Sequence, residues 1–232
     1  MSKVQLLTKM MCRSKEAACS RFLTVLVVLM LLAGCATGGK VVPETTVEIP
    51  QVPDGPTVTR FEDGRKGFTL SENANLDADT RRDFDLAVEF MENHEFDQAI
   101  ELLIKVVGTS PGVTAPYINL ALAYGKVGKP NLAEEHLQTA LNLFPGHPVA
   151  SNEYGLLLRK AGRFTEAKNI YEQALTIFPE YLPVRKNLGI LCDFYLNDQK
   201  CALAQFQLYS ELDPGNDQVK LWISELSFRS GQ

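Results

Sequence analysis

Residues 114–147 read TAPYINLALAYGKVGKPNLAEEHLQTALNLFPGH. The next 34 residues, PVASNEYGLLLRKAGRFTEAKNIYEQALTIFPEY at 148–181, repeat their pattern of apolar and small residues. The same pattern holds in residues 80–113 and, with one extra residue, in residues 182–216. A proline lies near the end of each unit: Pro111, Pro145, Pro179 and Pro214. A period of 34 residues indicates one supersecondary unit that buries its apolar face only by stacking on its neighbours.

Two positions in every unit hold small residues. The eighth position holds Ala87, Ala121, Gly155 and Gly189, and the twentieth holds Ala99, Ala133, Ala167 and Ala202. Bulky residues surround them at position seven (Leu86, Leu120, Tyr154 and Leu188) and position twenty-four (Leu103, Leu137, Tyr171 and Phe206). A turn separates the two halves of each unit, and the closing proline cannot continue a helix. Each unit is therefore predicted to be a hairpin of two helices that approach closely at the small residues.

These offsets resemble the tetratricopeptide repeat, whose pattern has Leu-Gly at positions seven and eight, Ala at twenty, an aromatic residue at twenty-four and Pro at thirty-two. The resemblance covers residues 80–216 and implies an all-α superhelix, an α-solenoid of four helical hairpins whose first helices line the inner surface. Position four departs from the pattern, because only the tyrosine conforms among Asp83, Tyr117, Ser151 and Arg185. The outer units also lack the pattern's last alanine, so we expect them to pack less tightly.

Residues 217–230 follow the fourth unit and are predicted to form a C-terminal capping helix that completes a repeat domain over residues 80–232. Asp217 is the expected N-cap, and Trp222 is expected to pack over the last hairpin.

Residues 1–34 resemble a bacterial lipoprotein signal peptide. Five basic residues precede the apolar run 22–32, which leads into the motif LAGC at residues 32–35. The run is too short for a bilayer core, which needs ~20 helical residues. The resemblance implies cleavage before Cys35, palmitate on Cys35 and, since Ala36 and not aspartate follows, an outer-membrane lipoprotein that faces the periplasm. The alternative is that the apolar run is an uncleaved membrane helix and that Cys35 follows it by coincidence. The sequence does not indicate which leaflet of the outer membrane the protein is attached to.

Residues 35–79 are predicted to be the lipidated cysteine and a flexible tether, because they are rich in Pro, Thr, Gly and charged residues. An Asp-Gly turn signal between Phe61 and Phe68 interrupts this composition. A lone hairpin is marginally stable in water, so we expect weak docking or disorder there.

Charge and motif content exclude several functions. The formal charge is −5 for the whole chain and −9 without residues 1–34, which carry five basic residues and one acidic residue. Nucleic acid binding needs a basic stripe, and the repeats have none. There is no phosphate-binding glycine loop, no histidine pair at metal spacing and no serine in a nucleophile elbow. We therefore expect no enzyme activity, no cofactor and no metal site.

Cys192 and Cys201 are the only cysteines that follow Cys35. They are expected late in the first helix and early in the second helix of the fourth hairpin, near bonding distance in an oxidising compartment. A disulfide and a pair of buried free thiols are both compatible with the sequence.

The inner surface is the predicted binding site. Its candidate residues are Val88, Asn119, Leu122, Asn152, Leu156, Arg159, Lys186, Asn187 and Ile190. The aliphatic members all occupy position nine and form a strip, and the asparagine amides offer a donor and an acceptor to the backbone of an extended peptide. Basic residues in the C-terminal half favour an acidic segment. The alternative is that the strip is buried between first helices and that the asparagines only repeat a common family residue.

Together these features predict a lipid-anchored envelope scaffold that binds a protein or peptide partner in its groove. Similar lipoproteins assist assembly of a pilus or secretion machine or recruit cell-wall enzymes. Assigning such a role to this chain is an analogy that rests on its fold and its expected cellular location. The alternative function is a structural lipoprotein that self-associates as a homodimer through its outer repeats, such as the one containing Asp83.

Overall fold

The computed structural model describes residues 56–61, 67–72 and 76–230, all within one compact unit, Pro50–Gln232. The predicted signal peptide, Cys35 and the first part of the tether lie outside the described residues. Within them, no helix combines the length and the hydropathy needed to cross a membrane.

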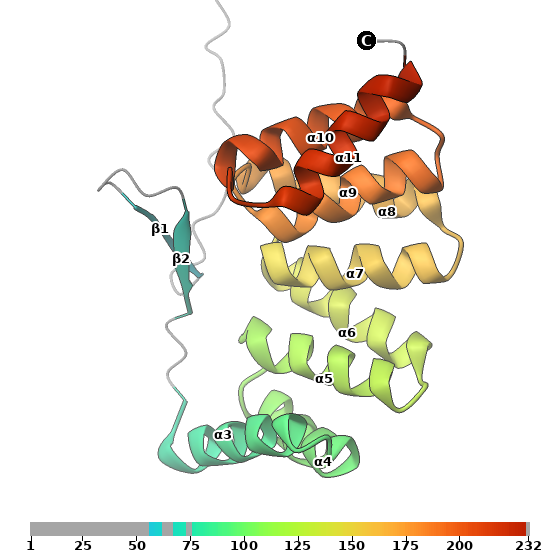
Figure 1. Cartoon of the computed structure of the whole chain (residues 1–232). Helices are drawn as coiled ribbons and strands as arrows, with labels where there is room; N and C mark the ends of the chain where they lie inside the picture. The colour runs from blue at the N-terminus through green and yellow to red at the C-terminus, as the bar shows by residue number, and fades with distance from the viewer. Residues whose placement is uncertain (1–55, 62–66, 73–75, 231–232) are drawn as a thin grey trace, which may run out of the picture. The chain divides into compact units, whose positions relative to one another are not determined.

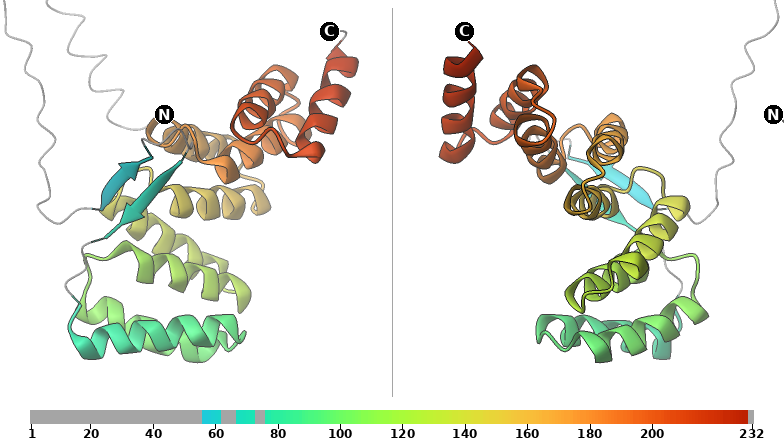
Figure 2. Two further views of the ribbon diagram at one scale, coloured as in Figure 1. Left: turned by 60° about the vertical axis from the view of Figure 1, so that its left-hand side comes forward. Right: turned by 90° about the vertical axis from the view of Figure 1, so that its right-hand side faces the viewer.

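The described residues form a short antiparallel hairpin followed by nine helices (Figure 1). The strands are β1 (Thr57–Arg60) and β2 (Phe68–Ser71). The helices are α3 (Ala78–Glu92), α4 (Phe96–Thr109), α5 (Thr114–Lys126), α6 (Pro130–Leu143), α7 (Pro148–Lys160), α8 (Phe164–Ile177), α9 (Leu182–Phe194), α10 (Gln199–Leu212) and α11 (Asp217–Ser230). Helices α3 to α10 stack as four hairpins and α11 lies on the last one, as Figure 2 shows from two further sides. The prediction of an all-α superhelix of four hairpins with a capping helix is confirmed.

The helices of each hairpin are held together by a small residue facing a large one. A Cβ on Gly155 of α7 would clash with the ring of Tyr171 in α8, and a Cβ on Gly189 of α9 would lie 2.5 Å from Phe206 in α10. Tyr171 and Phe206 are fully buried as a result. The first two hairpins place alanine opposite leucine at the same positions, so the size of one side chain matches the space that the other leaves.

Position seven joins each hairpin to the one before it. The Tyr154 hydroxyl of α7 lies 2.9 Å from the amide nitrogen of Gln138 and 2.9 Å from Glu134, both in α6. In α3 the corresponding Leu86 is 39% exposed, because the described chain has no hairpin before α3 on which it can pack. Leu86 was expected to pack around the small residues like the other bulky residues at position seven, and that prediction is wrong.

Polar residues at position four find partners inside the repeats. Asp83 is buried and forms an ion pair of 2.5 Å with Lys105 of α4. Arg185 is also buried and donates to the backbone oxygen of Pro179 at 2.6 Å and to Gln205 of α10 at 3.0 Å. The outer hairpins thus replace an aromatic contact with a hydrogen-bonded polar one, which keeps the buried charge satisfied.

The capping helix begins as predicted, but its cap residue differs. Asn216, and not Asp217, accepts the backbone N–H of Val219 at 3.2 Å. Val219 and Leu226 are buried, and the ring of Trp222 lies 5.1 Å from that of Phe206. The tryptophan therefore covers the fourth hairpin as expected.

The described last part of the predicted tether contacts the repeats, so of the two expected outcomes, weak docking and disorder, the structure shows docking. Arg60 of β1 donates to Glu180 at 2.9 Å and to the backbone oxygen of Ile177 at 2.6 Å. The Phe68 ring of β2 lies 4.7 Å from the ring of Phe178 at the end of α8. These contacts leave Val58, Phe68 and Leu70 half-buried, which supports a hairpin that would be marginally stable alone.

Glu72, which follows β2, completes the start of α5. Its carboxylate accepts the backbone N–H groups of Thr114 and Ala115 at 3.2 Å and also the Thr114 hydroxyl. The residue at the N-cap position, Val113, provides no side-chain hydrogen bond, and the first turn of α5 has no acidic residue. A carboxylate from a distant part of the chain therefore supplies the cap and the favourable charge at this helix end. We call the described residues 57–61 and 67–72 the N-terminal strap.

We predict that Gly155→Ala lowers the free energy of unfolding by about 1–3 kcal/mol, because the added methyl overpacks against Tyr171. Adding Tyr171→Leu should recover most of the loss, since alanine already faces leucine in the second hairpin. Urea unfolding followed by circular dichroism measures both. Gly125→Ala is the control, as its Cβ would meet nothing within 4 Å, and it should stabilise by up to about 1 kcal/mol. Equal losses for Gly155→Ala and Gly125→Ala would contradict this packing.

We predict that Glu72→Ala speeds hydrogen exchange of the Thr114 and Ala115 amides, because these groups lose their acceptor, and costs about 0.5–2 kcal/mol of stability. Exchange resolved by NMR measures the effect. Glu101→Ala, an exposed change on α4, should leave both amides unaltered. Unchanged exchange in Glu72→Ala would show that the strap does not cap α5.

Candidate peptide-binding groove

The predicted aliphatic strip lies along the first helices. Val88, Leu122, Leu156 and Ile190 come from α3, α5, α7 and α9 in turn, and every one of them is half-buried. Leu122 and Ile190 also pack against the core, while part of each of the four side chains remains accessible. The sequence left open whether the strip is an exposed binding surface or is buried between the first helices. The structure shows an intermediate case, because the strip residues are half-buried.

The strip opens into a cavity of about 660 Å³ between α5, α6 and α7. Leu122 and Leu156 face this space together with Leu157. Small residues keep it open: Gly125 and Gly128 line it, and nothing lies within 4 Å of a Cβ built on either. A hollow of this volume, with an apolar lining and a few polar groups, falls within the range of ligand-binding clefts.

The asparagines do not form the free row that the sequence suggested. The Asn187 amide donates to the Asn152 oxygen at 2.8 Å, and Asn152 donates to Glu153 at 2.9 Å. Asn152 is buried, so it links α7 to α9 and has little surface to offer a ligand. Asn119, half-buried on α5, and the remaining groups of Asn187 are the amides left for a peptide backbone.

Charged residues around the cavity differ in how they are satisfied. Arg163 contacts Glu134 at 2.6 Å and Glu166 at 2.8 Å, and its hydrogen bond lowers the pKa of the Glu166 carboxyl. Burial raises the pKa of the Tyr154 phenol, which therefore stays a donor to Glu134. Lys126 and Lys160 line the cavity, and both are exposed.

The other predicted basic groove residues lie nearer α9. The Arg159 guanidinium lies over the ring of Tyr195, 5.6 Å from its centroid. One of its terminal nitrogens is buried without a hydrogen-bond partner among the described residues. Lys186 is half-buried on α9. These residues extend the basic character of the site beyond the cavity.

Sequence reasoning missed an aromatic patch at the C-terminal end, which we define by Phe194, Trp222 and Phe228. Phe194 is 72% exposed and Phe228 is 88% exposed, and the three residues line a second hollow of about 330 Å³ between α9 and α11. Asp193 and Arg229, which form an ion pair of 2.8 Å, line the same hollow. The sequence did contain a signal for this patch. If α11 is numbered as the first helix of a fifth unit, Phe228 falls at position twelve, which lies on the groove side.

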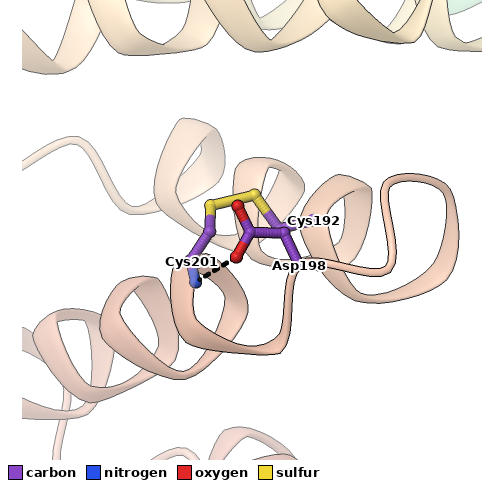
Figure 3. Close-up of side chains that lie close together, drawn as sticks. All are labelled: Cys192, Asp198 and Cys201. Carbon is purple, nitrogen blue, oxygen red and sulfur yellow. Dashed lines mark hydrogen bonds between the residues drawn. A yellow bond between two sulfur atoms is a disulfide. The ribbon is translucent and has the colours of Figure 1, made fainter.

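Cys192 and Cys201 are joined by a disulfide in the structure, with Cα atoms 5.9 Å apart (Figure 3). Asp198 lies beside them and caps α10 by accepting the Cys201 N–H at 3.0 Å. These three residues are of metal-binding type and lie close together. With both sulfur atoms in the S–S bond they do not offer a metal site, and the bridge instead ties α9 to α10.

Comparisons with known proteins agree with this geometry. Residues 118–181 match the family model of the tetratricopeptide repeat. A curated relative, anaphase-promoting complex subunit CDC16 of Saccharomyces cerevisiae, is 26% identical over 143 residues, which are 59% of this chain. This chain spans 17% of the length of CDC16.

Solved structures of bacterial repeat proteins resemble the fold. PilF of Pseudomonas aeruginosa matches with a TM-score of 0.58 and 23% identity, covering 65% of this chain and 68% of PilF. MamA of Desulfovibrio magneticus RS-1 matches with a TM-score of 0.58 and 17% identity, covering 67% and 87%. TTC0263 of Thermus thermophilus matches with a TM-score of 0.55 and 20% identity, covering 65% and 82%. At these identities the likeness concerns the fold alone.

The described residues therefore form a superhelix of the tetratricopeptide repeat type, and residues 118–181 carry the sequence of that repeat. This architecture is that of a scaffold for protein–protein interaction.

Proposed function

We propose that this protein is a lipid-anchored scaffold of the bacterial envelope that binds a protein partner along the strip of α3, α5, α7 and α9. The observation that carries the proposal is the cavity between α5, α6 and α7, where the strip widens into a hollow with apolar and basic lining. An extended partner segment that crosses the first helices would insert side chains there and meet Asn119 and Asn187 with its backbone.

The proposed location is the outer membrane, with the protein facing the periplasm. This proposal rests on the lipoprotein motif LAGC at residues 32–35 and on Ala36 after the cysteine. The disulfide between Cys192 and Cys201 fits an oxidising compartment. About 20 residues separate Cys35 from Pro56, which begins the described part of the strap region. At ~3.5 Å per extended residue the anchor can lie no more than roughly 70 Å from that point. The partner would be part of a pilus or secretion machine, or a complex of cell-wall enzymes.

A second function is favoured by the aromatic patch. Phe194 and Phe228 together expose apolar rings at one end of the solenoid, and large exposed apolar patches mark interaction sites. Self-association through this end would make the protein a structural homodimer. The first hairpin is a weaker candidate for a self-association surface, because Asp83 is already paired with Lys105.

We predict that a photoreactive amino acid at Leu156, introduced into the full chain in cells, crosslinks to a protein other than the chain itself. The same residue at Phe228 tests the second function, since capture of a second copy there would support homodimerisation. Leu143, 37% exposed on α6, is the control position away from the strip. If Leu156 captures no more than Leu143 does, the groove is not the partner site.

We predict that Cys35→Ser abolishes incorporation of labelled palmitate and moves the protein out of the membrane fraction, because no acyl chain can be attached. Cys192→Ser/Cys201→Ser keeps Cys35 and should leave both readouts unaltered. Palmitate labelling that survives in Cys35→Ser would contradict the proposed anchor.

A further inference from the structure

We propose that the cavity between α5, α6 and α7 selects partner segments in which an aliphatic side chain has an acidic residue on each side. This inference rests on the proposed groove function and adds the chemistry of the partner. The inference follows from two observations: the carboxylates at the cavity are engaged within the protein, and the lysines at the cavity are not.

The floor of the cavity is aliphatic. Leu122 of α5 and Leu156 and Leu157 of α7 line it from two neighbouring first helices. No aromatic residue lines the cavity, so a branched aliphatic side chain matches this lining by shape and by polarity.

The acidic residues at the cavity are already engaged within the protein. Glu134 is held by Arg163 at 2.6 Å and by the Tyr154 hydroxyl at 2.9 Å. Glu153 accepts the Asn152 amide at 2.9 Å. Their negative charge is thus directed toward internal donors and away from an incoming ligand.

The lysines at the cavity lack such partners. Lys126 and Lys160 occupy the same position in consecutive first helices, and neither forms an ion pair or side-chain hydrogen bond with the described residues. At that position α3 has Glu92 and α9 has Phe194, so among these four first helices the lysine pair is confined to the cavity. A cationic rim around an aliphatic floor, in a chain whose formal charge is −5, is complementary to a ligand that joins carboxylates to an apolar side chain.

The spacing of the lysines sets the spacing of the carboxylates. Neighbouring packed helices lie about 8–10 Å apart, and an extended chain rises ~3.3 Å per residue. Because a cavity separates α5 from α7, a segment that crosses both helices meets the two ammonium groups with acidic residues at least about three positions apart, and the aliphatic residue falls between them. Because both lysines are exposed, the attraction should weaken with added salt.

The test is a selection of displayed peptides on the full chain, purified in detergent. The library holds random 12-residue segments placed inside a carrier protein, so that no free C-terminal carboxylate is present. The expected result is enrichment of segments with an aliphatic residue between two acidic ones, and at least a tenfold loss of their recovery on Lys126→Gln/Lys160→Gln.

Lys129→Gln is the matched control, because Lys129 has the same charge but lies over the Tyr124 ring and does not line the cavity. It should retain the recovery, and thermal unfolding should show that all three chains are folded. Equal recovery on the double variant, or enriched segments without acidic residues, would overturn the inference and leave the groove function standing. If nothing is enriched on the unaltered chain, both the inference and the groove function fail.

Discussion

The close approach of two helices at a small residue is the constraint on which the rest of the structure depends. Gly155 and Gly189 admit the rings of Tyr171 and Phe206 to positions that any side chain would block. This contact fixes how each first helix is rotated about its axis, because position eight must face its own second helix. Position nine is then turned toward the neighbouring first helix and the groove. The aliphatic strip is thus a consequence of the packing that closes each hairpin.

The N-terminal strap and the cavity lie at opposite edges of the second and third hairpins. Glu72 binds the start of α5, while Arg60 binds the end of α8. The cavity is lined by Gly125, Lys126, Lys160 and Ala161, where α5 and α7 end. The strap therefore connects the second hairpin to the third on one edge, and the small residues keep the other edge open. A segment that reads as part of a tether contributes in this way to the geometry of the binding surface.

Much of the repeat architecture could be predicted from the sequence, because the residues that close each hairpin recur at fixed offsets. The helix ends, the capping helix and the place of Trp222 follow from local patterns. The strap could not be predicted in this way, since the partners of Phe68 and Glu72 lie far along the chain and do not belong to any repeat. The same holds for the bond between Asn152 and Asn187, which depends on the distance between two hairpins. The exposure of Phe228 does not follow from the four repeats, because α11 lies beyond them. The lipid anchor lies outside the described residues and stays a prediction.

The most direct test of the account is NMR of methyl-labelled protein in the presence of a soluble paramagnetic agent, which broadens the signals of accessible methyl groups. The packing described here predicts strong and similar broadening for Leu122, Leu156 and Ile190, and little for Leu120, Leu158 and Leu188, which are buried. Methyl groups of Leu122 and Leu156 that are as protected as those of Leu120 would show that the groove is closed, and would contradict the central claim.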